Sequence, residues 1–120
     1  MLLVDDEPGL LEALRLALTR AGCEVVACRT FDDAREQLLT EGFDVLVTDV
    51  RLGAFNGIQL AVIARSQARD IRIIVFSGFD DPVLKEEVAS LRAKFLLKPV
   101  TAEELLTEIA SCETGRIPNG

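Results

Sequence analysis

Five short apolar segments recur along the chain, and the stretches between them carry apolar residues at helical spacing. The apolar segments are residues 2–4, 23–28, 43–49, 71–77 and 94–98. DVLV (44–47) and IIVF (73–76) are continuous and rich in β-branched residues, which indicates strands covered on both faces. Helical crossovers between such strands require a parallel sheet with right-handed connections. The pattern therefore predicts an α/β domain in which one sheet lies between two layers of helices.

Local signals mark the ends of the expected helices. Pro8 and Pro82 suit the first turn of a helix, where the missing N–H is not needed. TAEE (101–104) is a capping box, in which the first and last residues satisfy each other's backbone donors. Gly22 and Gly42 stand where the first two helices should stop. These signals divide the chain at the same places as the apolar pattern.

Size and charge limit the classes of function. The 120 residues suffice for one domain with a single core. The formal net charge of -7 disfavours direct binding to nucleic acid or to an anionic membrane. No apolar run approaches the roughly 18 residues that span a bilayer, and no signal peptide precedes the first strand. The sequence therefore predicts a cytoplasmic protein.

Polar residues follow four of the five expected strands. Asp5 and Asp6 end the first strand, Asp49 the third, Ser77 the fourth and Lys98 the fifth. In open parallel sheets, ligands bind beyond the carboxyl ends of the strands. If the first and third strands are neighbours, three carboxylates share one crevice and repel one another. A divalent cation would relieve this repulsion, and Mg²⁺ prefers such hard oxygen ligands.

The same residues suggest a chemistry. A carboxylate can act as a nucleophile and carry a phosphoryl group, with a metal and a cation to neutralise the transferring oxygens. Asp49 fits the nucleophile, Lys98 the cation and Ser77 the hydroxyl donor. Each residue alone has an ordinary structural explanation as a turn former, a cap or a solvated side chain. The combination at one edge of one sheet favours the chemical interpretation.

Four sequence motifs together indicate a resemblance to a known family. LLVDDEP (2–8), DVLVTDVRLGAFNG (44–57), IIVFSG (73–78) and FLLKP (95–99) occur in order, with separations of 43 residues from Asp6 to Asp49, 28 to Ser77 and 21 to Lys98. With them the chain resembles the receiver domain of two-component response regulators over residues 1–113, which leaves residues 114–120 as a tail or the start of a linker. The resemblance implies a flavodoxin-like (βα)5 three-layer sandwich with strand order 2-1-3-4-5.

The resemblance also implies roles for the site residues. Asp49 would be phosphorylated by a histidine kinase or a phosphotransfer protein. Asp6 and Asp49 would bind Mg²⁺ directly, Asp5 through water, and the backbone carbonyl of Arg51 would add a further oxygen. Lys98 would pair with the phosphoryl group, and its peptide bond to Pro99 would be cis.

Two residues are expected to form the switch. Ser77 would move to donate to a phosphoryl oxygen, and Phe95 would then rotate inward, although plain core packing also explains a Phe at this position. The surface of the fourth helix, fifth strand and fifth helix would change as a result. A downstream protein, or a covalently linked output domain, would read that surface. The domain would have no independent substrate and would catalyse only its own phosphorylation and dephosphorylation.

Three features depart from the family pattern or tune it. Gly53 replaces the usual Pro in the loop after Asp49, which loosens that loop. Arg92 stands near the point where the fourth helix usually ends at Gly, at a cost of about 1 kcal/mol if it is left-handed. Arg51 and Phe79 lie two residues beyond Asp49 and Ser77, and this bulky pair predicts slow loss of the phosphoryl group.

Two other functions compete with this interpretation. A Mg²⁺-dependent phosphohydrolase also uses a strand-terminal Asp, but it favours an Asp-x-Asp pair and a cap domain, whereas this chain has adjacent Asp5 and Asp6. A receiver-like binding module that is never phosphorylated remains open because of the departures at Gly53 and Arg92.

Overall fold

The computed structural model describes residues 1–68 and 70–115, with side chains described up to residue 110. The predicted tail, 114–120, falls almost wholly outside the described residues, so its boundary stays a prediction. The elements follow in the order β1 (Leu2–Val4), α1 (Pro8–Arg20), β2 (Val26–Cys28), α2 (Phe31–Thr40), β3 (Val45–Asp49), β4 (Arg51–Leu52), β5 (Phe55–Asn56), α3 (Gly57–Gln67), β6 (Arg72–Ser77), α4 (Pro82–Ser90), β7 (Lys94–Leu97) and α5 (Ala102–Gly115).

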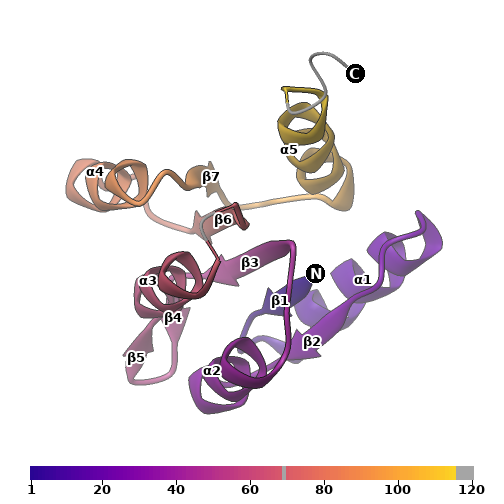
Figure 1. Cartoon of the computed structure of the whole chain (residues 1–120), viewed down its shortest axis with the longest axis horizontal. Helices are drawn as coiled ribbons and strands as arrows, with labels where there is room; N and C mark the ends of the chain where they lie inside the picture. The colour runs from indigo at the N-terminus through magenta and orange to yellow at the C-terminus, as the bar shows by residue number, and fades with distance from the viewer. Residues whose placement is uncertain (69, 116–120) are drawn as a thin grey trace.

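One parallel sheet of five strands organises the domain (Figure 1). Its order is β2-β1-β3-β6-β7, which is the predicted 2-1-3-4-5 when only the strands of this sheet are counted. Val4 at the end of β1 pairs with Cys28 of β2 and with Thr48 of β3. The register therefore places Asp5 and Asp49, each one residue further on, beside each other at the carboxyl edge.

The sheet separates two apolar layers, as the continuous apolar strands predicted. Leu3, Val47 and Phe76 face the layer built from α1 and α5, together with Leu14 and Leu105 of those helices. The other layer contains the alternate residues of the same strands and the inner faces of α2, α3 and α4. Figure 1 shows the two groups of helices on opposite sides of the sheet. The predicted three-layer fold is confirmed.

The predicted helix starts agree with the structure. Pro8 and Pro82 are the first residues of α1 and α4. Thr101 and Glu104 form the capping box: the Thr101 N–H donates to Glu104 Oε1 at 3.0 Å, and the Glu104 N–H donates to Thr101 Oγ1 at 3.1 Å. Gly22 follows the end of α1 with a φ of 100°. These local contacts explain why the helices begin and end where the sequence signals lie.

One expectation needs correction. The second strand was predicted over residues 23–28, but β2 comprises only Val26–Cys28, because its one neighbour, β1, is itself three residues long. The segment after Asp49 is an antiparallel ribbon in which Arg51 pairs with Asn56, and the loosening of this segment by Gly53 stays a prediction. Gly53 takes a φ of 64° at the tip of this ribbon, a conformation that favours glycine.

The turn after α4 shows how the chain manages without a glycine there. Arg92 adopts a φ of 57°, in the left-handed region. The Arg92 N–H donates to the Ala89 carbonyl at 2.9 Å, and the Ala93 N–H donates to the Val88 carbonyl at 3.1 Å. This pair of bonds is a Schellman motif, which ends α4 at Ser90.

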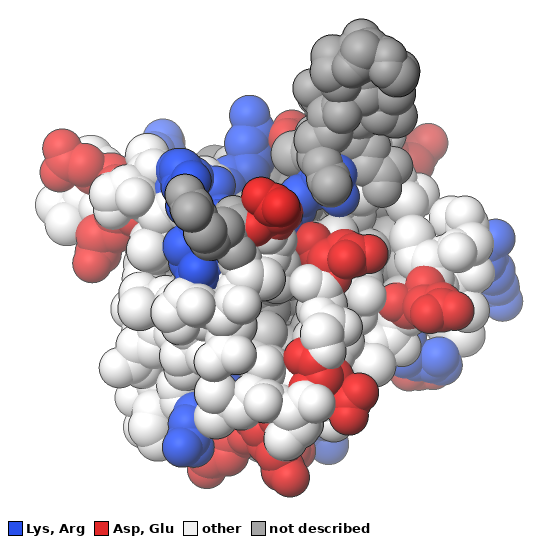
Figure 2. Space-filling view, in the orientation of Figure 1, with Lys and Arg blue, Asp and Glu red and all other residues white. Residues whose placement is uncertain are grey.

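The surface shows mixed charge. On the face seen in Figure 2, acidic and basic side chains are interspersed and separated by uncharged surface. Within the described ranges, no helix has both the length and the apolar character required to cross a bilayer.

Gly57, the first residue of α3, packs closely against the end of β3 at the carboxyl edge of the sheet. A Cβ on this residue would overlap the backbone oxygen of Asp49 and lie 2.8 Å from Thr48 Oγ1. We expect Gly57→Ala to lower the free energy of unfolding by about 3 kcal/mol, because α3 must move away from the end of β3. Urea unfolding monitored by circular dichroism measures this change.

Gly9→Ala is the matched control. Gly9 lies in the first turn of α1, where an added Cβ meets nothing within 4 Å. This variant should keep or slightly raise the stability, by up to about 1 kcal/mol. Equal effects of the two substitutions would contradict the packing argument.

Candidate functional site

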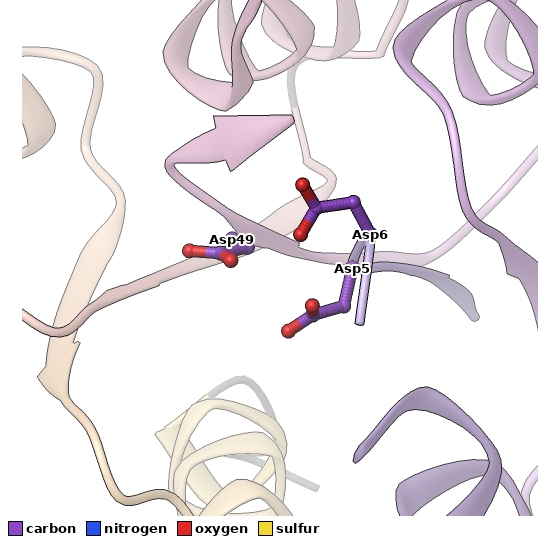
Figure 3. A group of neighbouring side chains, drawn as sticks. All are labelled: Asp5, Asp6 and Asp49. Atoms are coloured by element: carbon purple, nitrogen blue, oxygen red, sulfur yellow. The ribbon is translucent and has the colours of Figure 1, made fainter. Parts of the chain in front are cut away.

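Three carboxylates converge at the carboxyl edge of the sheet. Asp5, Asp6 and Asp49 each place an oxygen within 4.8 Å of the others. Asp5 is fully buried and Asp49 is 6% exposed, whereas Asp6 is exposed. Figure 3 shows all three carboxylates extending to the same side of the strand ends. The adjacent pair Asp5 and Asp6 therefore supplies one buried and one accessible carboxylate.

Backbone N–H groups orient each carboxylate. Asp5 Oδ1 accepts a hydrogen bond from the Glu7 N–H at 2.8 Å. Asp49 Oδ1 lies 3.4 Å from the Arg51 nitrogen. Asp6 Oδ2 accepts from the Gly53 N–H at 3.3 Å, which links the first loop to the tip of the β4–β5 ribbon. Each of these backbone contacts engages one oxygen of its carboxylate and so fixes the orientation of the acid.

Lys98 joins two of the acids. Its Nζ lies 3.0 Å from Asp49 Oδ2 and 3.4 Å from Asp5 Oδ2. Its backbone N–H donates to the Ser77 carbonyl at 2.8 Å, so β6 and β7 fix where the side chain starts. The peptide bond between Lys98 and Pro99 is cis, as the family resemblance implied.

The charges at this edge do not balance. Three carboxylates and one ammonium, Lys98, leave a net charge of two negative units when all are ionised. Burial raises the pKa of the Asp5 carboxyl, the charge of Asp49 adds to the rise, and the Glu7 N–H and Lys98 offset only part of it. Burial by itself lowers the pKa of Lys98, but its hydrogen bond to Asp49 and the two carboxylate charges outweigh this and raise it. Lys98 therefore stays protonated.

The oxygen donors fit a divalent cation. Carboxylate oxygens at this spacing are hard ligands of the kind that Mg²⁺ and Ca²⁺ take. A divalent charge would also cancel the two excess negative charges described above. The geometry includes the predicted ligands Asp5, Asp6 and Asp49. The role of the Arg51 carbonyl stays a prediction.

Ser77 and Phe95, the two predicted switch residues, lie on neighbouring strands. Ser77 is buried at the end of β6, and its hydroxyl oxygen accepts a hydrogen bond from the Phe79 N–H at 3.1 Å. Phe95, in β7, is half-buried and packs against the core on the α2, α3 and α4 side. The Lys85 ammonium lies 5.8 Å from the centre of its ring. Their movement on phosphorylation stays a prediction.

Two contacts at the site were not visible in the sequence. The Arg51 guanidinium lies over the Phe79 ring, 4.4 Å from its centre, beside a cleft of about 610 Å³ that Ser77 also lines. On the other side, Phe55 of the ribbon stacks on Phe31 of α2 with 4.8 Å between ring centres. The sequence marks Arg51 and Phe79 as a bulky pair but does not predict their contact, and it gives no signal for the stack of Phe31 on Phe55, whose rings come from α2 and β5.

The fold and the site together define a class of protein: an open parallel α/β domain whose carboxyl edge holds an acidic cluster bridged by lysine. A sequence profile described as "Response regulator receiver domain" matches residues 1–110. The chain belongs to this family of response regulator receiver domains, the phosphorylation-activated signalling switches of two-component systems.

Individual relatives agree with this assignment. The C4-dicarboxylate transport transcriptional regulatory protein DctD of Pseudomonas aeruginosa is 33% identical over 113 residues, which cover 91% of this chain and 24% of that protein. The structure of a response regulator receiver protein from Sinorhizobium medicae matches with 31% identity and a TM-score of 0.85, covering 96% of this chain and 94% of that one.

A third relative contains a modified site. A response regulator from Burkholderia pseudomallei, solved with a phosphorylated aspartic acid, a calcium ion and citrate, is 25% identical with a TM-score of 0.82, covering 98% of this chain and 74% of that one. This chain spans about a quarter of the length of the first curated relatives that it matches.

The raised pKa of Asp5 leads to a stability prediction. Asp5→Asn keeps an acceptor for the Glu7 N–H but removes a buried negative charge beside Asp49. We expect it to raise the free energy of unfolding by roughly 1 kcal/mol in metal-free buffer at neutral pH, because carboxylate repulsion is relieved. Urea unfolding in the presence of a chelator measures the difference.

Asp44→Asn serves as the control, since Asp44 is an exposed acid next to the opposite end of β3. It should leave stability within about 0.5 kcal/mol of the parent protein. A loss of stability in Asp5→Asn under the same conditions would contradict the electrostatic account.

Proposed function

We propose that Asp49 accepts a phosphoryl group, with Mg²⁺ bound by the acidic cluster, from a histidine kinase or a phosphotransfer protein. The observation that carries this proposal is the placement of Asp49, whose carboxylate lies 3.0 Å from Lys98 Nζ and within 4.8 Å of oxygens from Asp5 and Asp6. A nucleophilic carboxylate needs positive charge close to it when an anionic group approaches. The cluster and Lys98 meet this need.

The chain's own residues act in one transfer step. An oxygen of Asp49 forms a bond to phosphorus while the P–N or P–O bond to the donor breaks, and its electron pair stays with the donor. Lys98 is protonated throughout and pairs with the oxygens of the transferred group. Ser77 donates its hydroxyl to another of these oxygens. Bound Mg²⁺ supplies further neutralisation of the charge on them.

Asp6, Asp49 and Asp5 would hold the metal, with the Arg51 carbonyl as a further ligand. Asp6, which is exposed, would be reached by an ion from solvent, whereas Asp5 is fully buried. The solved relative from Burkholderia pseudomallei, which contains calcium and a phosphorylated aspartic acid, supports a divalent cation beside such a residue. The choice of Mg²⁺ rests on the family resemblance.

The switch would pass from Ser77 to the surface formed by α4, β7 and α5. The Ser77 hydroxyl oxygen accepts from the Phe79 N–H, and on movement toward Asp49 its own O–H would donate to a phosphoryl oxygen. Phe95 would then rotate inward. The resulting change in the surface would be read by a downstream protein or by a linked output domain.

The cellular setting follows from the same family. The chain's longer relatives are regulators, such as the transcriptional regulatory protein DctD, so a larger protein containing this domain would act in the cytoplasm through its output. The domain itself would have no substrate beyond its own phosphoryl group. The net charge of -7 argues against direct contact with nucleic acid or with a membrane surface.

Phosphorylation is tested directly by intact mass. Incubation with acetyl phosphate and Mg²⁺ should add the mass of one phosphoryl group, because a small donor needs only the site itself. Asp49→Asn should gain nothing, and a chelator should abolish the gain in the parent protein. Asp44→Asn, at the other end of β3, should be modified like the parent.

An adduct that persists in Asp49→Asn would refute the assignment of the acceptor. If the parent shows no adduct, beryllofluoride with Mg²⁺ distinguishes rapid hydrolysis from an inert site. A folded protein that binds neither would instead be a receiver-like module that recognises partners without phosphorylation.

The Arg51–Phe79 pair predicts a long-lived phosphoryl group. The stacked guanidinium and ring border the cleft beside Ser77 and would screen the acyl phosphate from attacking water. We expect the double variant Arg51→Ala/Phe79→Ala to lose the phosphoryl group about tenfold faster, which corresponds to a barrier lower by about 1.4 kcal/mol. Following the adduct by mass after donor removal measures the rate.

Leu39→Ala, which shortens an exposed side chain on α2, is the control for this experiment and should decay like the parent. An unchanged rate of phosphoryl loss in the double variant would contradict the screening hypothesis.

A further inference from the structure

The carboxyl end of α4 is held by one side chain from another helix. Arg65 lies in the last turn of α3. Its Nε donates to the Leu91 carbonyl at 3.1 Å, its Nη2 to the Arg92 carbonyl at 3.1 Å and its Nη1 to the Ile71 carbonyl at 2.8 Å. A single guanidinium therefore joins α3, the segment before β6 and the turn between α4 and β7.

The turn that Arg65 contacts is costly to form. Arg92 is left-handed, a backbone conformation in which the Cβ of a non-glycine residue crowds the neighbouring carbonyl oxygen. The carbonyls of Leu91 and Arg92 also lie just beyond the end of α4, where the helix supplies no backbone N–H group to donate to them. Hydrogen bonds from a charged donor are stronger than neutral ones. Arg65 thus stabilises a conformation that the local sequence disfavours.

The surroundings of the Arg65 guanidinium both favour and oppose its positive charge. Arg65 is half-buried, and burial together with the nearby charge of Arg92 lowers the pKa of its guanidinium. The carbonyl dipoles at the end of α4 favour a cation at this place. The helix end and the charge of Asp70 therefore favour the guanidinium at this place, whereas burial and the charge of Arg92 oppose it.

The position of this contact connects it to the switch. The loop that begins at Ser77 leads into α4, and the turn that Arg65 holds leads within three residues to Phe95 in β7. Any displacement of α4 that accompanies movement of Ser77 and Phe95 must act against the bonds from Arg65, because these fix the far end of the helix.

We propose that Arg65 is a positioning residue that holds α4 and the α4–β7 turn in the unphosphorylated arrangement and so opposes the phosphorylated one. This inference rests on the proposed function of Asp49. Removal of the guanidinium should loosen the turn and make the site bind a phosphoryl group more tightly, although Arg65 touches none of the site residues Asp5, Asp49, Ser77 and Lys98 through the bonds described above.

Two measurements on Arg65→Gln test the proposal. Amide hydrogen exchange should be about tenfold faster at Arg92 and Ala93, the donors of the Schellman motif, because charged hydrogen bonds to the turn are lost. Beryllofluoride with Mg²⁺, a stable mimic of the phosphoryl group, should bind about threefold to tenfold more tightly. Arg35→Gln removes an exposed guanidinium from α2 and should change neither quantity.

Two further variants keep the test decisive if Arg65→Gln folds poorly. Arg65→Lys keeps the charge but not the three-pronged donor geometry, and should show a smaller shift in the same direction. In an Arg92→Gly background, the left-handed turn forms without strain, so Arg65→Gln should have less than half its effect on exchange, measured as the logarithm of the rate.

Faster exchange with unchanged beryllofluoride affinity would overturn the proposal, since Arg65 would then only stabilise the turn. Unchanged exchange would overturn it as well. If the parent protein itself fails to bind beryllofluoride, the proposed function fails first, and this result is distinguishable because it is independent of residue 65.

Discussion

Repulsion among three carboxylates at one edge of the sheet is the constraint on which the rest of the structure depends. Asp5 and Asp49 are forced together because β1 and β3 pair in register, and both are buried. Lys98 lies within 3.4 Å of both and cancels only part of their charge. The fold therefore keeps a site that gains most when a cation arrives, and the apolar layers on both sides of the sheet supply the stability that the site itself lacks.

The sheet and its helices could be predicted because the spacing of apolar residues and the residues that mark helix ends indicated the same elements. The apolar segment 43–49 contains β3, Val45–Asp49, and the first-turn prolines and the capping box at Thr101 mark helix starts that the structure confirms. The convergence of Asp5, Asp6 and Asp49 followed from the general position of ligand sites in parallel sheets. The chemistry of a carboxylate nucleophile, a lysine and a hydroxyl donor suggested the roles of Asp49, Lys98 and Ser77, whereas the role of the Arg51 carbonyl and the water-mediated role of Asp5 came from the family resemblance alone.

What escaped prediction depends on contacts between distant loops. The extent of β2 is set by the length of β1, which propensity does not report. The β4–β5 ribbon had no signal in the sequence, and its Phe55 stacks on Phe31 of α2, a residue from a distant part of the chain. Arg92 likewise takes a conformation that a helix end usually leaves to glycine, and its support comes from α3, 27 residues earlier.

The two sides of the acidic cluster are unequal in stiffness. On the α2 and α3 side, the Phe31–Phe55 stack and the close approach of Gly57 to the end of β3 leave the loop after Asp49 little room to shift. On the α4 side, the Ser77 hydroxyl accepts a hydrogen bond from the Phe79 N–H, and α4 ends in a turn with a left-handed Arg92. A change at Asp49 therefore meets closely packed residues on the α2 and α3 side and less constrained residues on the α4 side. The asymmetry of packing alone thus gives the domain a preferred direction for transmitting a local change in charge.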